Sequence, residues 1–501
     1  MGTASKHKSA APGVNLPEGT SGSAFLHKIL TETVREFPHE LSAARLSPEP
    51  GRFKARLGDQ LARFEAVRCA SPRRSEIARH IVQRTQEGLV YRPRGEQTPQ
   101  SFGEYLKGEG QAFELERHGD GSAPGLAPQV PFEGRNYGAA ELGALASLLV
   151  ERGFMTQAAG DALCWIGDYA LSHAGRISLG GQRFALLGAA AELAPTRFLL
   201  EAGAKVLWLD LQSPNAETLP GGELHYAPEG SDLLCDPRRC KQTLLEFAAG
   251  EPLHLGLYAY AAGESQEWRL ASTMNGIARS LPEGVLESIS LWISPTTPSQ
   301  VRPGCSELTE RRAARPPLWQ SALKKSGMLS PGHERHQGVS TARAVVSIQG
   351  VSYQAAQYIA KLLAAEVYAA EGSSFEGHTR PLTVSANVAG ITRTKSLAHP
   401  LFEAAFEGAP AFNIEIFLPE TTRALATLLM LHDLLNPAAV ANAKSLEHGI
   451  SPETRAARLG EVQVHGGVYT NPHALEPSIR VAAVLGMTKR PGLARGLFGK
   501  N

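Results

Sequence analysis

An α/β fold, in which helices cover both faces of a parallel sheet, is the fold class that this sequence predicts. From residue 183 onward, short apolar runs alternate with helical patterns, which is typical of parallel strands joined by helical crossovers. Runs such as Phe184–Leu187 and Val206–Asp210 are almost continuously apolar, as expected for strands buried on both faces. The chain has 501 residues, of which 43% are hydrophobic, and is long enough for two or three domains.

The expected elements of this region follow one another in the order of a doubly wound sheet. We expect strands at Phe184–Leu187, Val206–Asp210, Leu224–Tyr226, Leu253–Ala261, Ile289–Ser294, Leu382–Asn387 and Glu461–Val464. We expect helices at Pro195–Ala202, Arg238–Ala249, Glu267–Ser280, Tyr353–Ala370 and Thr421–Leu435. These elements predict a Rossmann-like nucleotide-binding domain over residues 179–475, with a polar, arginine-rich insert at residues 300–340.

The first part of the chain carries a different pattern. Small polar residues predict a disordered tail at residues 1–22. Residues 23–178 are expected to form an α-helical N-terminal extension, either as a separate domain or as a cap on the sheet, with an irregular connector at residues 93–136. Its expected helices are Ala24–Phe37, Arg52–Ala70, Arg74–Glu87, Ala139–Arg152 and Gln157–His173. A C-terminal tail is expected at residues 476–501.

Composition narrows the function classes. The formal charge is +1, so no overall field favours nucleic acid or an anionic membrane. The five cysteines show no C-x-x-C spacing, and His333 and His336 stand in no recognised ligand pattern, so no metal site is expected. The sequence shows neither the apolar run of a secretion signal nor a membrane-spanning stretch. We therefore expect a cytoplasmic protein.

The stretch from Phe184 to Asp210 is the most informative for function. An apolar strand is followed by Gly188, by a short helix, and by a second strand that ends at Asp210. A glycine at this point allows a tight turn whose backbone N–H groups can reach an anion. A carboxylate at the end of the second strand can accept hydrogen bonds from both ribose hydroxyls, and it repels a 2′-phosphate, which favours NAD over NADP. An ordinary βαβ unit, in which Asp210 only ends a strand, remains the alternative.

Four segments, in this order along the chain, resemble the short-chain dehydrogenase/reductase family. Leu187–Ala194 is similar to its glycine-rich turn, and Glu201–Asp210 to the end of its first helix and its second strand. Thr383–Leu397 resembles the strand and loop after the active-site helix, and Val462–Tyr469 resembles the last strand. The resemblance implies an NAD(P)-dependent oxidoreductase that acts on a carbonyl or alcohol. The cofactor-binding residues that it implies are Gly188, Ala189, Glu192, Leu193, Asp210, Ala261 and Gly263.

The turn departs from the family pattern. Only Gly188 of the three family glycines is present, and Glu192 and Ala194 occupy the other two positions. A carboxylate at Glu192 would repel a pyrophosphate on the same N–H groups. Glu192 therefore either turns away, or occupies the anion site itself, or the ligand is not a dinucleotide.

In this family a tyrosine, and a lysine four residues later, share one face of the long helix, while a serine orients the substrate carbonyl. Here Gln357 stands four residues after Tyr353, and neither Tyr353 nor Tyr358 has the family spacing to Lys361. An alignment on the end of the helix would instead place Gln349 at the tyrosine position. The catalytic candidates that the resemblance implies are Ser294, Tyr353, Tyr358, Lys361 and Asn275.

Two functions fit these observations. The first is an NAD(P)-dependent oxidoreductase of short-chain dehydrogenase type with a small-molecule substrate. The second is a non-catalytic Rossmann-fold protein that binds a ligand or acts as a scaffold, because the tyrosine–lysine spacing is lost. A methyltransferase is less favoured, since the first strand has no acid. The insert suggests either a lid for an anionic substrate or a solvated loop, and the long helix suits a homodimer. The cations of the insert that suggest an anion are Arg311, Arg312, Lys324 and Lys325.

Overall fold

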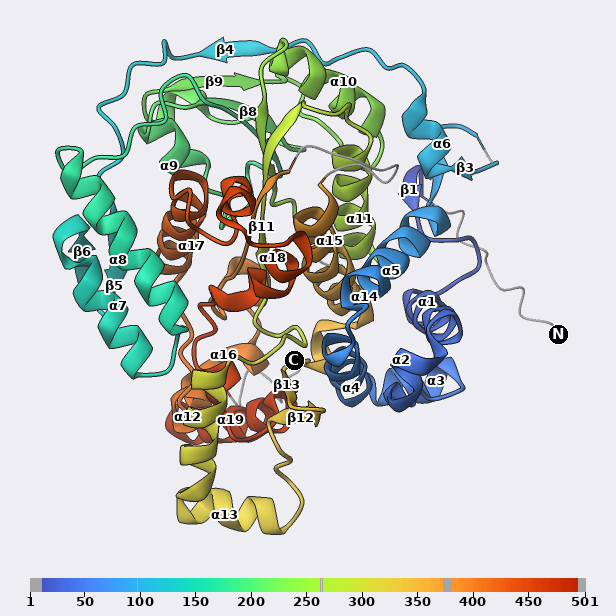
Figure 1. Ribbon diagram of the computed structural model, residues 1–501, viewed down its shortest axis with the longest axis vertical. Helices are drawn as coiled ribbons and strands as arrows, with labels where there is room; N and C mark the ends of the chain where they lie inside the picture. The colour runs from blue at the N-terminus through green and yellow to red at the C-terminus, as the bar shows by residue number, and fades with distance from the viewer. Residues whose placement is uncertain (1–10, 97, 262, 264, 373–380, 494–501) are drawn as a thin grey trace.

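The computed structural model describes residues 11–96, 98–261, 263, 265–372 and 381–493. Its centre is a sheet in which seven strands lie in the order β14-β11-β10-β7-β8-β9-β4 (Figure 1). The strands are β4 (Glu116–His118), β7 (Arg183–Leu187), β8 (Lys205–Leu209), β9 (Glu223–Tyr226), β10 (Leu253–Leu257), β11 (Leu286–Ile293) and β14 (Thr383–Val388). All pairings are parallel except that of β4 with β9 at the edge. The predicted α/β class with a mostly parallel sheet is therefore confirmed.

Alternate residues of the strands face two different cores. Ala185 and Leu187 of β7 belong to one hydrophobic cluster, and Phe184 and Leu186 belong to another. Both faces are therefore covered, which explains why the strands are continuously apolar. The first cluster includes α10 (Pro237–Ala248), α11 (Gln266–Arg279) and the long helix α14–η5–α15 (Val351–Ala355, Ala356–Leu363 and Ala364–Glu371). The second includes α9 (Thr196–Glu201) and α17 (Pro419–Leu435).

Helices of the first 178 residues lie on both faces of the sheet. The helices α1 (Gly22–Glu36), α4 (Leu57–Ala70) and α5 (Arg74–Gly88) contribute to the core that contains the long helix. The helices α7 (Leu142–Glu151) and α8 (Gln157–Ser172) contribute to the opposite core, where α8 contacts α17. Their positions on opposite sides of the sheet can be followed in Figure 1. This region also supplies β4, which lies in the expected connector and extends the sheet.

Smaller elements complete the N-terminal part. Residues 1–10 of the expected tail lie outside the described residues, and Gly13–Asn15 form β1, which pairs with β2 (Val90–Arg92). The other short α-helices and strands of this part are α2 (Pro38–Leu41), α3 (Pro50–Ala55), β3 (Gln100–Ser101), α6 (Phe102–Lys107), β5 (Gln129–Phe132) and β6 (Arg135–Gly138).

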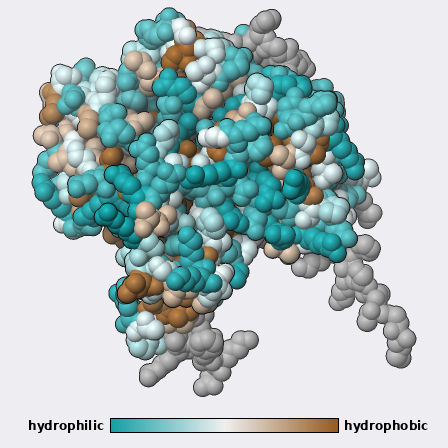
Figure 2. Space-filling view, turned by 60° about the horizontal axis from the view of Figure 1, so that its bottom comes forward, coloured by the Kyte–Doolittle hydropathy of each residue, from teal (hydrophilic) through white to brown (hydrophobic). Residues whose placement is uncertain are grey.

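The insert and the C-terminal part form a projecting end of the molecule (Figure 1). The insert contains α12 (Pro303–Ala314), α13 (Leu318–Lys325), β12 (His333–His336) and β13 (Val339–Ala342). Figure 2 brings this end forward and shows apolar residues on it, and the insert exposes the large apolar side chains of Leu318, Trp319 and Met328. Among the described helices, none is long and apolar enough to cross a membrane.

Two expectations for the C-terminal part differ from the structure. Residues Leu475–Lys489, within and beside the expected tail, form α19, which packs on α16 (Pro400–Gly408). The two helices can come this close because Gly408 has no side chain. A Cβ on Gly408 would lie only 1.9 Å from the carbonyl oxygen of Ala482. The expected strand Glu461–Val464 makes only isolated bridges, and the chain turns away at Gly466 and Gly467, which both have a positive φ. The short helix α18 (Pro452–Arg458), which precedes this segment in the chain, lies beside α15.

Candidate functional site

The turn after β7 brings the ends of two strands into close contact. Gly188 has φ of +92°, and a Cβ at this position would lie 2.1 Å from the backbone nitrogen of Ala259. Only glycine fits here, because the chain that follows β10 passes directly against it. The next helix, α9, begins at Thr196 instead of directly after Gly188. An anion at this turn would therefore meet the N–H groups of the turn and not the first turn of a helix.

Asp210 follows β8 and faces the same turn. Its Oδ2 accepts a hydrogen bond from the backbone N–H of Ala190 at 3.0 Å. Burial raises the pKa of Asp210, and hydrogen bonds from backbone N–H groups oppose this shift. The carboxylate thus joins the end of β8 to the turn after β7.

Glu192 turns away from the N–H groups of its own turn. Its Oε2 accepts a hydrogen bond from the backbone N–H of Lys395 at 3.0 Å, in the segment after β14. Its backbone carbonyl accepts a hydrogen bond from Nε of Arg423 at 2.9 Å. Of the three alternatives for Glu192, this contact fits the first, and it does not test the third, a ligand that is not a dinucleotide. The neighbouring residues are also fixed: the Ala189 carbonyl accepts from Thr196 Oγ1, and the Leu193 carbonyl accepts from Trp292 Nε1.

Ser294 and Tyr353 come together at the carboxyl end of β11. The Ser294 Oγ lies 2.8 Å from Oγ1 of Thr296, and the phenol of Tyr353 lies close to both hydroxyls. Tyr353 lies in the first turn of the long helix, which therefore presents it to the strand end. Gln357, one turn later at the position of the family lysine, accepts a hydrogen bond from the Ser294 backbone N–H at 2.9 Å. The structure thus unites two of the predicted catalytic residues, with a glutamine instead of a lysine beside them.

The surroundings of Tyr353 keep its phenol protonated. Burial raises the pKa of Tyr353, and the charges of Glu267 and Tyr260 raise it further, while the hydroxyls of Ser294 and Thr296 lower it. The net shift is upward. A protonated phenol beside two hydroxyls is suited to donate a proton to a developing alkoxide.

A buried ion pair lies beneath the loop after β10. Nζ of Lys361 lies 4.0 Å from Oε1 of Glu267, and both side chains are buried. The Glu267 Oε2 accepts a hydrogen bond from the Ala261 backbone N–H at 2.9 Å, but Oε1 has no hydrogen-bond partner among the described residues. Burial lowers the pKa of Lys361 and raises the pKa of Glu267, while their mutual attraction opposes both shifts. Gly263, in the same loop, is exposed and has φ of +109°.

Tyr358 and Asn275 lie elsewhere in the core. Tyr358 is fully buried and donates a hydrogen bond to Oε2 of Glu65 in α4 at 2.7 Å. Asn275 Nδ2 donates to the carbonyl of Ala360 at 2.6 Å, and its Oδ1 accepts from the hydroxyl of Tyr368 at 2.8 Å. Ala360 lies in η5, where the long helix is π-helical, so Asn275 fixes this wider turn. These two residues hold the long helix in place.

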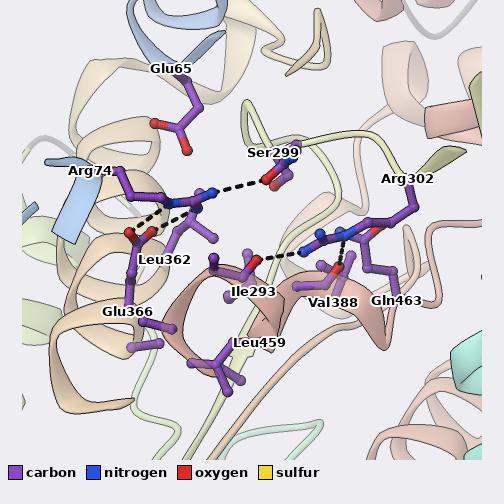
Figure 3. Close-up of a pocket in the computed structure, with 16 residues that line it drawn as sticks. Glu65, Arg74, Ile293, Ser299, Arg302, Leu362, Glu366, Val388, Leu459 and Gln463 are labelled. Carbon is purple, nitrogen blue, oxygen red and sulfur yellow. Dashed lines mark hydrogen bonds and ion pairs between the residues drawn. The ribbon is translucent and has the colours of Figure 1, made fainter. Parts of the chain in front are cut away.

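A small cavity lies near the ends of β11 and β14 (Figure 3). Its volume is about 30 Å³, which is room for one water molecule. Arg74 and Glu366 lie on one side, and Arg302 and Gln463 on the other. The Gln463 Oε1 has no partner among the described residues, as expected for a polar atom that faces a buried water.

The four cations of the insert that suggested an anionic substrate lie in two places, on two different helices. Arg311 and Arg312 lie on α12 and line a second, larger cavity, whereas Lys324 and Lys325 are exposed on α13. Within the described part of the chain, no group of three or more His, Cys, Asp or Glu side chains is placed to hold a metal ion.

Sequence reasoning missed Glu267 and Tyr260, which lie beside Tyr353. Their position in the sequence could have indicated them. Both follow β10, and they therefore lie at the same edge of the sheet as Ser294, which follows β11. The chain matches no known family and no curated protein at a significant level of similarity.

Proposed function

We propose that this protein is an NADH-dependent reductase of short-chain dehydrogenase type that acts on a carbonyl substrate. The observation that carries the proposal is the cluster of three hydroxyl groups, from Ser294, Thr296 and Tyr353, at the carboxyl end of β11. A tyrosine and a serine in this relation are the groups that the resemblance implies for proton transfer and substrate orientation.

The arrangement of the strands supports a dinucleotide as cofactor. Numbered along the chain, the six parallel strands lie in the order 3-2-1-4-5-6, which is the order of the Rossmann fold. The order reverses between β7 and β10, and dinucleotides bind at this switch point. Gly188 and Asp210 lie there, and the Asp210 carboxylate favours NADH over NADPH because it would repel a 2′-phosphate.

The residues of the chain have distinct roles in this proposal. Bound NADH supplies the hydride that reduces the carbonyl carbon. Ser294 orients the carbonyl oxygen, and Tyr353 donates its proton to that oxygen. Because the pKa of Tyr353 is raised, the protonated acid predominates, and carbonyl reduction is favoured over alcohol oxidation. Lys361 and Glu267 fix the loop after β10, beside which the cofactor ribose would lie.

A non-catalytic ligand-binding protein is the second candidate. It is favoured by Gln357, which stands where the family lysine would lower the tyrosine pKa, and by the contact of Glu192 with Lys395. This contact bridges the turn after β7 and the segment after β14, and it would have to coexist with a bound pyrophosphate.

The test is an assay of NADH oxidation with a panel of aldehydes and ketones, in which the loss of NADH absorbance measures turnover. We expect Tyr353→Phe to lower kcat by at least about a hundredfold, since general acid catalysis contributes that much, with NADH affinity retained. Tyr226→Phe is the matched control, because Tyr226 lies on β9 at the other end of the sheet. Equal turnover by Tyr353→Phe and wild type would contradict the proposal, and NADH binding without turnover of any carbonyl would favour the second candidate.

A further inference from the structure

A cavity of about 830 Å³ lies between the start of α8 and the insert helix α12. Isolated bridges join Val388 to Gln463 and Met155 to Val464, so this cavity lies beyond the β14 edge of the sheet. The turn after β7 lies several strands away. The cavity is therefore a separate site, and the inference that follows does not depend on the proposed reductase activity.

Three arginines line this cavity. Arg302 donates hydrogen bonds to the carbonyls of Gly460 at 2.9 Å and Ala457 at 3.2 Å. Arg312 donates to the carbonyls of Thr470 at 3.1 Å and Arg152 at 2.9 Å.

Backbone carbonyls thus fix both guanidinium groups, and neither forms an ion pair with a carboxylate of the described residues. Arg311 is exposed at the same cavity and also forms none there. Burial lowers the pKa of Arg302 and of Arg312, and the charge of Glu461 offsets this shift only partly for Arg302.

The acids at the cavity leave this positive charge uncompensated. Glu461 forms an ion pair with Arg458 at 3.0 Å, and Glu151 is exposed at the end of α7. The first turns of α8 and α12 also border the cavity, through Gln157 and Gly304. Helix starts add partial positive charge and free N–H donors.

The rest of the lining is apolar and includes Val150, Met155 and Leu308. Ligand sites commonly have this composition, in which an apolar wall accompanies a few fixed polar groups, and the volume falls in the range of small-molecule sites. We propose that this cavity binds a small amphipathic anion, a molecule with one carboxylate or phosphate head group and a short apolar chain. The arginines hold the head group, and Val150, Met155 and Leu308 contact the chain.

The test is calorimetric titration of the full chain with octanoate, octyl phosphate and octan-1-ol. We expect saturable binding of at least one of the two anions, with an affinity at least about tenfold above that of octan-1-ol, because the neutral alcohol lacks the charge-assisted contacts. The comparison of octanoate with octyl phosphate identifies the preferred head group.

Two variants connect that binding to the cavity. Gly304→Phe fills it, since a Cβ at Gly304 meets no atom within 4 Å, and we expect anion affinity to fall more than about tenfold. Arg311→Gln is expected to weaken it roughly fivefold, as for removal of an exposed charge, while Arg315→Gln, exposed at the end of α12, leaves it unchanged. Thermal unfolding of each variant verifies the fold. Absence of saturable binding, equal affinity for octan-1-ol, or unchanged affinity in Gly304→Phe would overturn the proposal.

Discussion

Two groups of buried charges meet the long helix, and they differ in how completely they are hydrogen-bonded. In the first, Glu366 accepts hydrogen bonds from Arg68 at 2.9–3.0 Å and from Arg74 at 3.0–3.1 Å, and Arg68 also binds Glu65 with two hydrogen bonds. In the second, Lys361 lies 4.0 Å from Glu267, and Glu267 Oε1 has no partner in the described structure.

The pKa shifts of the two carboxyl groups follow this difference. Burial alone would raise the pKa of Glu366, but the charges of Arg68 and Arg74 outweigh it and the net shift is downward. The pKa of Glu267 is raised by burial, which Lys361 only partly offsets. A buried charge stabilises a fold only when its hydrogen-bonding capacity is met. We infer that the first group is structural, and that the second is retained because its position at the loop after β10 serves ligand binding.

The largest expected effect is on stability, from Arg68→Ala. This change leaves Glu65 and Glu366 buried without their shared cation, and we expect the free energy of unfolding to fall by about 3–5 kcal/mol. Urea unfolding measures it. Arg73→Ala is the control, because Arg73 forms exposed ion pairs with Glu40 and Glu76 and should cost less than about 1 kcal/mol. Equal losses from the two variants would remove the distinction between the groups.

Lys361→Met tests the second group. Glu267 can take up a proton when its partner is removed, because its pKa is already raised, so we expect the free energy of unfolding to change by less than about 1 kcal/mol. We expect NADH affinity to fall roughly tenfold, since the loop after β10 loses a fixed contact. Lys324→Met, exposed on α13, is the control for both measurements. A large loss of stability with full NADH affinity would make Lys361 structural as well.

The low pKa of Glu366 predicts a particular dependence on pH. A depressed carboxyl pKa contributes stability that is fully present above the unfolded value of 4.5 and is lost as the pH falls toward the folded value. The stability advantage of wild type over Glu366→Gln should therefore shrink between about pH 5 and about pH 3. Urea unfolding at several pH values tests this, and a constant difference would show that the carboxylate charge is not the source.

Glu267 should show the smallest effect, with the opposite sign. Its folded pKa is raised, so ionisation costs stability at a pH above the folded value, and this cost vanishes as the pH falls below 4.5. We expect Glu267→Gln to be slightly more stable than wild type at neutral pH and equal to it in acid. A less stable Glu267→Gln at neutral pH would mean that the ion pair with Lys361 is net stabilising.

The sequence predicted the six parallel strands of the sheet, because each depends on a local pattern, but it missed β4 and wrongly expected a strand at Glu461–Val464. Apolar runs and their order placed the strands, and the residues at strand ends, Gly188, Asp210 and Ser294, followed from those runs. The pairing of Arg68 with Glu366 was not predictable, since 298 residues separate them and no local pattern records such a contact.

The relation of Tyr353 to Lys361 was also beyond the sequence patterns. The spacing rule for the tyrosine and the lysine assumes an α-helix. Here Ala356–Leu363 form a π-helix, which begins after Tyr353 and contains Lys361. The extra residue per turn changes which side chains share a face. Asn275 holds this segment through Ala360, and a π-helix of this kind has no recognisable sequence signature.

We propose that the turn after β7 and the end of β8 hold NADH, and calorimetric titration of the protein with NADH and NADPH measures this binding. We expect NADH to bind with a Kd of about micromolar order and NADPH more weakly. Asp210→Ala should weaken NADH binding at least about tenfold, and Glu217→Ala, an exposed acid that follows β8, should not change it. Binding of neither nucleotide would contradict this proposal and would favour the second candidate, in which the ligand is not a dinucleotide.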